Sequence, residues 1–326
     1  MTTADSNNVS NLLANGDGRC QESVIYDAGA MSAMAGIAGD VEGDGDDDVG
    51  AASSGSDDIS ILMNNGDGTF QPAVNHLAGD GPYSISAADL DGDGDNDLAV
   101  ANRDSDNVSV LLNNGDGTFP EASNSGPLGD RPYSVFAADL DGDKVKDLAV
   151  ASCYTNNVWI LFNHGDGTFQ EAVEYHAGEQ AFAVLAAELD GDNDNDLAVT
   201  SEFLNNFSVL VNNGDGTFLA PENCSTGAGP FSVFAADLDG DNDEDLAVAN
   251  YYSDTSSVSV LLNNGDGTYQ VPVDYDTAPH GEYPTSVCAA DFDGDNDNDL
   301  AVTCRESGVT ILLNNGDGTF LKGMDY

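Results

Sequence analysis

The segment Asp89-Leu90-Asp91-Gly92-Asp93-Gly94-Asp95-Asn96-Asp97 decides the fold, because its pattern recurs along the chain. Six segments of this kind begin at Asp40, Asp89, Asp139, Glu188, Asp237 and Asp291. A second motif, Asn-Gly-Asp-Gly or once His-Gly-Asp-Gly, alternates with them and places its first glycine at 16, 66, 115, 165, 214, 265 and 316. A repeat of about 50 residues that fills the whole chain predicts one repeat architecture and a single domain over residues 1–326.

One repeat, from 133 to 182, shows which structure the sequence favours. Its short apolar segments are 134–138, 148–151, 158–162 and 169–175. They are separated by the acidic loop, a polar turn and a Gly-Asp-Gly turn, whose Asn-Gly and Asp-Gly pairs suit positive φ angles. Helical periodicity is absent, so we expect an all-β fold. Four antiparallel strands per repeat are typical of a β-propeller blade, whereas a β-solenoid, the alternative, usually has shorter repeats.

The repeats do not divide the chain evenly. We expect six complete four-stranded blades at approximately 31–79, 80–129, 130–178, 179–228, 229–280 and 281–326. Residues 1–30 add an N-terminal half-blade, a hairpin over 8–26 without an acidic segment before it. Six-fold and seven-fold closure both stay open. The chain is then either a fragment, or its extra hairpin pairs with a neighbouring subunit by strand addition and builds a filament.

The acidic segments predict metal sites. In residues 89–97, carboxylates stand at positions 1, 3, 5 and 9, with glycine at position 4. Four carboxylates within nine residues repel one another unless a cation lies between them. Calcium takes 6–8 oxygen ligands in flexible geometry, whereas magnesium demands an octahedron and keeps its own water. Transition metals favour His or Cys ligands, which these loops lack. We therefore expect about six Ca²⁺ sites.

The expected ligands are the four carboxylates of each loop together with position 7, which would contribute its backbone carbonyl. The first three sets are Asp40, Glu42, Asp44, Asp46, Asp48; Asp89, Asp91, Asp93, Asp95, Asp97; and Asp139, Asp141, Asp143, Val145, Asp147. The other three are Glu188, Asp190, Asp192, Asp194, Asp196; Asp237, Asp239, Asp241, Asp243, Asp245; and Asp291, Asp293, Asp295, Asp297, Asp299. The longer Glu42 and Glu188 predict weaker sites, and so do Lys144 and Lys146 inside the third loop.

Taken together, the acidic loops and the Gly-Asp-Gly-Thr-Phe segments that follow them resemble the FG-GAP or VCBS repeats of integrin α-subunit-like β-propellers. The resemblance covers essentially the whole chain. It implies a calcium-stabilised propeller, usually of seven blades, in proteins that are extracellular or on the cell surface. It also implies adhesion, glycan binding or scaffolding, with some repeats appended to enzymes. The incomplete seventh unit departs from this pattern.

The charge of the chain excludes several classes of function. The chain holds 59 Asp and Glu against 7 Lys and Arg, a formal net charge of −52. So few cations exclude nucleic-acid binding and docking on an anionic membrane, and no apolar run is long enough for membrane insertion. The N-terminus has neither the basic start nor the apolar run of a secretory signal. No nucleophile elbow, HExxH pair or phosphate loop is present, so we expect that the chain is not an enzyme.

Residues outside the acidic loops suggest further roles. An aromatic stands six residues before four of the loops, at Tyr83, Tyr133, Phe182 and Phe231, while Met34 and Thr285 break the pattern. These rings either pack blades together or form a platform for sugar rings, so a glycan-binding lectin is an alternative function. Four sequons begin at Asn8, Asn107, Asn206 and Asn223, which makes a glycoprotein possible. Cys288 and Cys304 flank the last loop and are either two buried thiols or a disulfide.

Overall fold

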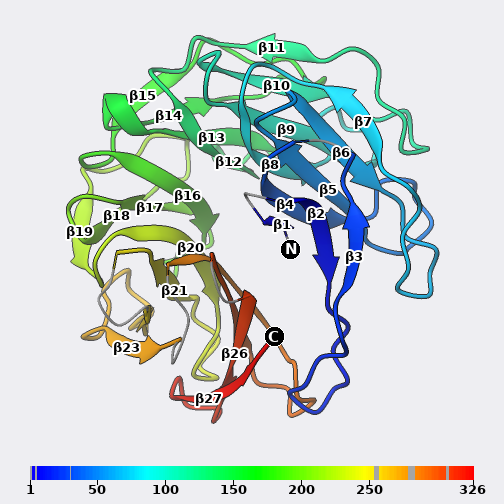
Figure 1. Cartoon of the computed structure of the whole chain (residues 1–326). Helices are drawn as coiled ribbons and strands as arrows, with labels where there is room; N and C mark the ends of the chain where they lie inside the picture. Colours follow the sequence, from blue (N-terminus) through cyan, green and yellow to red (C-terminus); the bar gives the residue numbers. More distant parts are fainter. Residues whose placement is uncertain (1, 4–5, 30, 253–256, 278–282, 306–307) are drawn as a thin grey trace. The chain divides into compact units, whose positions relative to one another are not determined.

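The protein is all-β, with the antiparallel blades of a β-propeller. A computed structural model covers the chain and describes residues 2–3, 6–29, 31–252, 257–277, 283–305 and 308–326. Within these residues the sole helix is the short 3-10 turn η1 (Cys153–Thr155). Six four-stranded sheets are present, and in each one the strands neighbour one another in chain order, as Figure 1 shows. The predicted fold class and the six complete blades are therefore confirmed.

The chain forms two compact units, which are described separately. Unit 1 contains Met1–Asn11 and Val24–Tyr175, and unit 2 contains Leu12–Ser23 and His176–Tyr326. The prediction of a single domain over 1–326 stays a prediction.

Unit 1 is built from three blades and an N-terminal sheet. Blade 1 comprises β4 (Ala33–Gly39), β5 (Asp48–Ser53), β6 (Asp58–Leu62) and β7 (Val74–Leu77). Blade 2 comprises β8 (Pro82–Ala88), β9 (Asp97–Asn102), β10 (Asn107–Leu111) and β11 (Ser123–Ser125). Blade 3 comprises β12 (Pro132–Ala138), β13 (Asp147–Ser152), β14 (Asn157–Leu161) and β15 (Val173–His176). The N-terminal sheet comprises β1 (Thr2–Thr3), β2 (Ser6–Asn11) and β3 (Val24–Asp27).

Unit 2 is built from the other three blades. Blade 4 comprises β16 (Ala181–Ala187), β17 (Asp196–Ser201), β18 (Asn206–Leu210) and β19 (Glu222–Ser225). Blade 5 comprises β20 (Pro230–Ala236), β21 (Asp245–Asn250), β22 (Ser257–Leu261) and β23 (Val273–Asp276). Blade 6 comprises β24 (Pro284–Ala290), β25 (Asp299–Cys304), β26 (Gly308–Asn314) and β27 (Phe320–Asp325).

The first two strands of a blade hold its acidic loop. In blade 2, β8 pairs with β9 so that Ala88 faces Asp97 and Ser86 faces Ala99. Every residue of β9 is buried, which suits its small and branched apolar side chains. Because the loop joins the ends of two hydrogen-bonded strands, its first and last carboxylates are brought to the same end of the blade.

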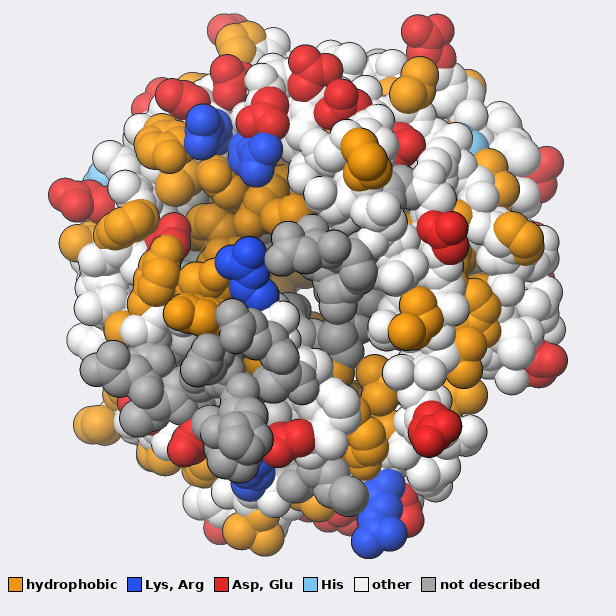
Figure 2. Space-filling view, in the orientation of Figure 1, with side chains coloured by type: hydrophobic (Ala, Val, Ile, Leu, Met, Phe, Trp, Pro, Cys, Tyr) orange, Lys and Arg blue, Asp and Glu red, His pale blue; other side chains and the backbone are white. Residues whose placement is uncertain are grey.

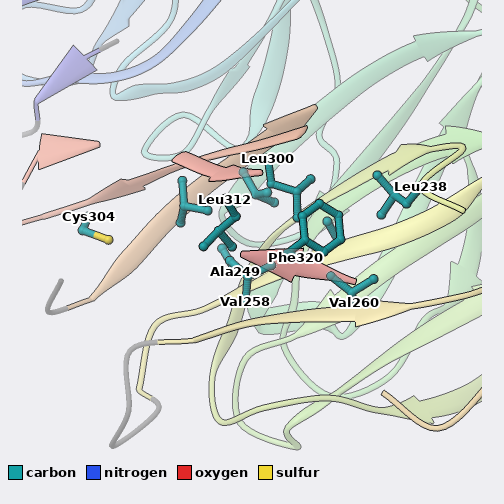
Figure 3. Close-up of a cluster of buried hydrophobic side chains, with 11 residues drawn as sticks. Leu238, Ala249, Val258, Val260, Leu300, Cys304, Leu312 and Phe320 are labelled. Atoms are coloured by element: carbon teal, nitrogen blue, oxygen red, sulfur yellow. The ribbon is translucent and has the colours of Figure 1, made fainter. Parts of the chain in front are cut away.

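Apolar side chains of neighbouring blades form the core. In unit 2, Leu238, Val260, Leu300, Leu312 and Phe320 belong to one buried cluster drawn from blades 5 and 6, shown in Figure 3. Clusters of the same kind join the blades of unit 1. Blades therefore pack face against face through the branched side chains of their strands, as expected of interdigitating sheets.

The N-terminal segment differs from the predicted two-stranded hairpin. A further strand, β1, pairs with β2, so this sheet has three strands. Val9 and Ala28 of the sheet are buried with Ala51 and Leu62 of blade 1. The edge strand β1 could not be foreseen, because Thr2–Thr3 is too short to give a periodic signal.

The turn of this hairpin belongs to unit 2. The backbone N–H of Gly18 donates to the carbonyl of Phe292 over 3.0 Å. The N–H of Cys20 donates to the Tyr326 hydroxyl over 2.8 Å. Phe292 lies in the last acidic loop, so the extra Gly-Asp-Gly turn docks on the loop of blade 6 in its own chain.

Candidate metal centres

The six nine-residue acidic segments, here called the metal loops, share one hydrogen-bonded skeleton. In the loop of blade 2, the two carboxylate oxygens of Asp89 accept the N–H groups of Gly92 and Gly94 at 2.7 and 3.1 Å. Asp91 accepts the N–H of Asp93. These bonds wrap the chain around the first carboxylate, and oxygens of positions 1 and 3 come together with one of position 9.

Two positions of every loop take a left-handed backbone. Gly92 and Gly94, at positions 4 and 6, have φ angles of +81° and +96°. Position 6 is Gly in blades 1 and 2 and Asn in blades 4, 5 and 6, and both types tolerate this region. Lys144 fills position 6 of blade 3 with φ +75° and is the exception. Position 6 is Gly or Asn in five of the six loops, a signal that the sequence motif did not include.

The ninth position anchors the loop to its blade. Asp97 is fully buried, and its two oxygens accept the N–H groups of Leu90 and Asn113 at 2.8 and 2.7 Å. Burial raises the pKa of Asp97 to about 6, even though the two hydrogen bonds act to lower it. The same burial raises the pKa of Asp147 and Asp245 to about 6 and of Asp196 to about 7. Burial therefore disfavours the ionised form of these carboxylates, and a cation nearby would favour it.

Five of the six loops gather three carboxylates. One oxygen from each of three side chains lies within 4.8 Å of the others. The groups are Asp89, Asp91, Asp97; Asp139, Asp141, Asp147; Glu188, Asp190, Asp196; Asp237, Asp239, Asp245; and Asp291, Asp293, Asp295. Such clusters of acidic residues could bind metal ions at several repeats. The longer Glu188 joins its group, whereas the described residues of the first loop, which carries Glu42, form no group of this kind.

The oxygen atoms in these loops suit a hard cation. Oδ1 of Asp190 and Oδ1 of Asp239 are buried and have no hydrogen-bond partner among the described residues. Burial and the neighbouring carboxylates raise the pKa of both side chains. A buried carboxylate oxygen without a donor is costly unless a cation is close to it. Since every candidate ligand is an oxygen atom, the donor set fits Ca²⁺ better than a transition metal.

The carboxylates at position 7 of the metal loops lie outside these three-residue groups. A methyl group added at Gly115 would lie 2.4 Å from Oδ2 of Asp95, and one added at Gly214 would lie 2.3 Å from Oδ2 of Asp194. These aspartates therefore lie against the first glycine of the Gly-Asp-Gly turn in their own blade. Their carboxylates are absent from the three-residue groups, so only their backbone carbonyls stay as proposed ligands.

The Gly-Asp-Gly turns of the complete blades are stabilised by their own side chains. In blade 2, Oδ1 of Asp116 accepts both the N–H and the hydroxyl of Thr118. These hydrogen bonds lower the pKa of Asp116, and the other turns of the complete blades repeat them. The turn aspartates thus serve local structure.

In four blades an asparagine two residues before the first glycine of the turn links neighbouring blades, which the sequence motifs did not reveal. In blade 3, Nδ2 of Asn163 donates to the carbonyls of Leu90 and Lys146 at 2.7 and 2.9 Å. Leu90 is position 2 of the metal loop in blade 2. Asn113, Asn263 and Asn314 make the same pair of bonds. Asparagine occupies this position in all six complete repeats, while Ala14 stands there in the extra N-terminal turn, and this recurrence was the available signal.

The aromatic positions predicted before the loops pack against each other. In unit 1 the rings of Tyr83 and Tyr133 are 4.6 Å apart, edge to face. In unit 2 Phe182 lies 4.3 Å from Phe231, which stacks on Tyr251 at 5.2 Å. These ring contacts agree with the blade-packing interpretation, and the sugar-platform interpretation stays a prediction.

The cysteines do not form the disulfide that the sequence left open. None of the five, all of which lie in the described part of the chain, is in a disulfide, and Cys304 is buried while Cys288 is exposed. In the ladder, Cys288 faces Ala301 while Cys304 faces Pro284, so the two thiols lie at different heights of the sheet.

Comparisons with known proteins agree with this fold. The model of the FG-GAP-like repeat matches residues 40–100, 89–150, 145–199, 188–248 and 243–302. A lectin of Agrocybe aegerita described as specifically recognising non-reducing terminal N-acetylglucosamine has 20% identity and a TM-score of 0.68, over 100% of this chain and 91% of its own. The BP39L lectin of Burkholderia pseudomallei has 15% identity and a TM-score of 0.68, over 99% and 96%. No curated protein sequence matches significantly.

One comparison corrects a prediction. A putative 6-phosphogluconolactonase of Bacteroides fragilis has 14% identity and a TM-score of 0.68, over 99% of this chain and 95% of its own. The expectation that the chain is not an enzyme is overturned by this likeness, because the same fold is found in a protein named as an enzyme. Absence of familiar catalytic motifs was insufficient ground for the exclusion. Separately, no helix in the described part of the chain is long and apolar enough to cross a membrane.

Proposed function

We propose that this chain, which belongs to the family of FG-GAP-like repeat proteins, is a calcium-binding β-propeller that serves as a recognition or adhesion module outside the cell. The observation that carries the proposal is the gathering of three carboxylate oxygens within 4.8 Å in five metal loops. The unpartnered buried oxygens of Asp190 and Asp239 support it.

In each loop, positions 1 and 3 would hold the ion together with position 9 or position 5. Position 7 would add its backbone carbonyl, and water would complete the shell. When bound, Ca²⁺ supplies positive charge that offsets the repulsion among these carboxylates. Position 9 also orients the loop, because its oxygens already accept the N–H groups of position 2 and of the asparagine before the next turn.

Calcium binding would act on the packing between blades as well as inside one blade. The carbonyl at position 2, such as that of Leu90, accepts Nδ2 of the asparagine in the following blade. Ordering a loop therefore orders a hydrogen bond to its neighbour. Because the ion would bind the folded loops and not the unfolded chain, it stabilises the fold by mass action.

The same chemistry supports an extracellular location. Six bound ions would change the net charge from −52 to −52 + 12 = −40, and calcium sites of extracellular modules are filled at millimolar concentration. The alternative of a filament built by the N-terminal hairpin is less favoured, because Val9 and Ala28 of that hairpin are buried against blade 1 of the same chain.

Thermal melting of the full chain tests the proposal. Metal-depleted protein is compared in Ca²⁺, in the same concentration of Mg²⁺, and without divalent ions, all at physiological ionic strength. We expect Ca²⁺ to raise Tm well beyond Mg²⁺, since both ions screen the net charge equally. The double variant Asp190→Asn, Asp239→Asn should lose part of the gain, and Asp116→Asn in a turn should keep it. Equal melting with and without Ca²⁺ would refute the proposal.

Glycan binding is a second candidate function, favoured by the aromatic surface of unit 2. Tyr251 lies 5.0 Å from the ring of Tyr283 and 4.9 Å from that of Tyr252. Tyr252 is 52% exposed and Tyr283 is 38% exposed, so ring surface is available to a sugar. Two lectins share the fold. On a glycan array, Tyr252→Ala should reduce binding, while Leu321→Ala, an exposed apolar residue of β27, should leave it unchanged; equal binding by wild type and Tyr252→Ala would reject this surface.

A further inference from the structure

Two positions vary between repeats while their surroundings stay nearly constant. The first follows the second strand of each blade and is Ser54, Arg103, Cys153, Glu202, Tyr251 and Arg305 in turn. The second precedes the first strand and is Ser32, Gly81, Arg131, Gln180, Gly229 and Tyr283. All six residues of this second set have positive φ. Variation confined to such turns on a regular scaffold is typical of a binding surface.

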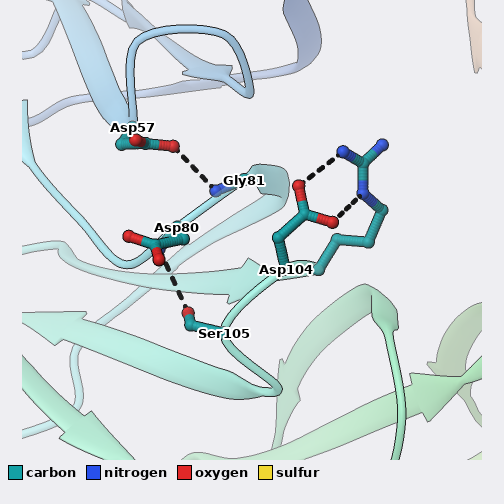
Figure 4. Close-up of polar contacts among 6 residues, drawn as sticks. Asp57, Asp80, Gly81, Asp104 and Ser105 are labelled. Atoms are coloured by element: carbon teal, nitrogen blue, oxygen red, sulfur yellow. Dashed lines mark hydrogen bonds and ion pairs between the residues drawn. The ribbon is translucent and has the colours of Figure 1, made fainter.

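In unit 1 these positions bring arginine and tyrosine together. The guanidinium of Arg103 lies 5.7 Å from the centre of the Tyr83 ring, and that ring meets the edge of Tyr133. Asp104 holds Arg103 through two hydrogen bonds of 2.9 and 2.6 Å, drawn in Figure 4. One guanidinium is thus fixed in place and paired.

The second arginine is positioned but not paired. Arg131 has φ +59°, and its backbone N–H donates to Oδ1 of Asp106 over 2.9 Å, which fixes the backbone at this residue. Its guanidinium lies 5.0 Å from the centre of the Tyr154 ring, and contact with the Tyr133 hydroxyl raises the pKa of Arg131. Arg131 is exposed, and no ion pair to it occurs among the described residues. Its side chain can therefore accept an anion.

This concentration of positive charge is unusual for the chain. Two of its seven Lys and Arg side chains lie close enough to interact, since Arg103 acts to lower the pKa of Arg131. Figure 2 shows how few Lys and Arg side chains the drawn face carries. Tyr83 precedes the metal loop of its blade by six residues of extended strand, or about 20 Å. That distance exceeds the Debye length of about 8 Å at physiological ionic strength, so the acidic loops do not repel an anion at this site.

We propose that Arg103, Arg131, Tyr83, Tyr133 and Tyr154 form a binding site for a carboxylate-bearing sugar, such as a hexuronate unit of an acidic polysaccharide. The guanidinium of Arg131 binds the carboxylate, because its planar donors match the two oxygens. The exposed face of Tyr154, 54% accessible, packs against the sugar ring. This inference rests on the glycan-binding candidate and extends it to a second surface, in unit 1, whose ligand class is carboxylate-bearing sugars.

Titration calorimetry on the calcium-loaded full chain tests the site. The ligands are tetragalacturonate, the neutral cellotetraose, and citrate as a carboxylate without a sugar. We expect tetragalacturonate to bind at least about tenfold more tightly than either control. Arg131→Gln should weaken it about tenfold. The fold accepts this change, because Gln180 fills the equivalent position with φ +56°. Arg19→Gln removes one exposed cation elsewhere and should leave affinity unchanged.

Other results of these titrations would contradict the proposal in different ways. Equal weakening by Arg131→Gln and Arg19→Gln would show a general charge effect and overturn the site. Citrate binding as tight as tetragalacturonate would overturn the sugar specificity. Binding of neutral glycans on the array together with no response to tetragalacturonate would reject this inference alone, whereas no binding to any glycan would reject the candidate function beneath it. The calcium proposal is judged separately, from Tm.

Discussion

Nδ2 of Asn113 donates a 2.6 Å hydrogen bond to the carbonyl oxygen of Val41, which is position 2 of the metal loop in the preceding blade. The backbone N–H of Asn113 donates to Asp97 in its own blade over 2.7 Å. Its Oδ1 accepts the N–H groups of Gly115 and Gly117. One buried amide therefore joins two metal loops and a turn, which explains why the two sequence motifs alternate.

Removing this amide should destabilise the fold. Asn113→Ala leaves the Val41 carbonyl and the two glycine N–H groups without partners, and a buried unsatisfied group costs about 1–3 kcal/mol. We expect a loss of about 3 kcal/mol in the free energy of unfolding, measured by urea denaturation. Asn114→Ala is the control, because Asn114 is exposed and bonds only within the turn, to Thr118. Similar losses in both variants would contradict the role given to Asn113.

Calcium stoichiometry should reveal the first loop as different. Five loops gather three carboxylates and the loop with Glu42 does not. We expect metal-depleted protein titrated with Ca²⁺ to bind five ions tightly, as measured by calorimetry. Glu42→Asp restores the side chain found at position 3 in every other loop and should add one tight site. Glu22→Asp, an exposed change outside the loops, should add none; six tight sites in the unaltered chain would overturn this difference.

Strands and loops could be predicted from the sequence because they depend on local patterns. The metal loop of blade 3 was expected at 139–147, and β12 and β13 end and begin there. Contacts between blades could not be predicted in this way. Nothing local in the sequence says that Asn163 reaches Leu90, 73 residues earlier. Likewise, the motif assigns only the backbone carbonyl of Asp95 to the metal and does not say that its carboxylate lies against Gly115 in three dimensions.

Each of the two positions in a Gly-Asp-Gly turn needs glycine for a different steric reason. In the complete blades the first glycine faces position 7 of its own loop. In blades 5 and 6 the second faces position 3 of the preceding loop: a methyl group at Gly267 would lie 3.2 Å from Cβ of Asp190. The second glycine of the extra N-terminal turn makes the same contact, since a methyl group at Gly18 would lie 3.4 Å from Cβ of Asp293. The hairpin looks unpaired in the sequence because this docking joins residues that are far apart along the chain.

Alanine at the first glycine tests this packing. Gly115 and Gly16 have similar φ angles of +77° and +73°, so alanine at either carries the same left-handed cost of about 1–2 kcal/mol. At Gly16 nothing lies within 4 Å of the added methyl group, whereas at Gly115 it meets Asp95. We expect Gly115→Ala to be more destabilising by about 1 kcal/mol or more in urea denaturation. Adding Asp95→Ala should remove the excess; an excess that persists would place its cause elsewhere.

The stabilisation that calcium provides should grow with pH, whereas the contribution of the buried carboxylates without metal falls with pH. The pKa of Asp97, Asp147 and Asp245 is raised to about 6 and that of Asp196 to about 7. Without metal these groups favour the fold when protonated, so their contribution is present below pH ~4 and is lost as pH rises through 6–7. Calcium requires the ionised form, so its stabilisation should grow over the same window. The check is the difference in urea midpoint with and without Ca²⁺, in metal-depleted protein without chelator, between pH 5 and pH 8. The turn aspartates, whose pKa is lowered, cancel in this difference; a constant difference would contradict the prediction.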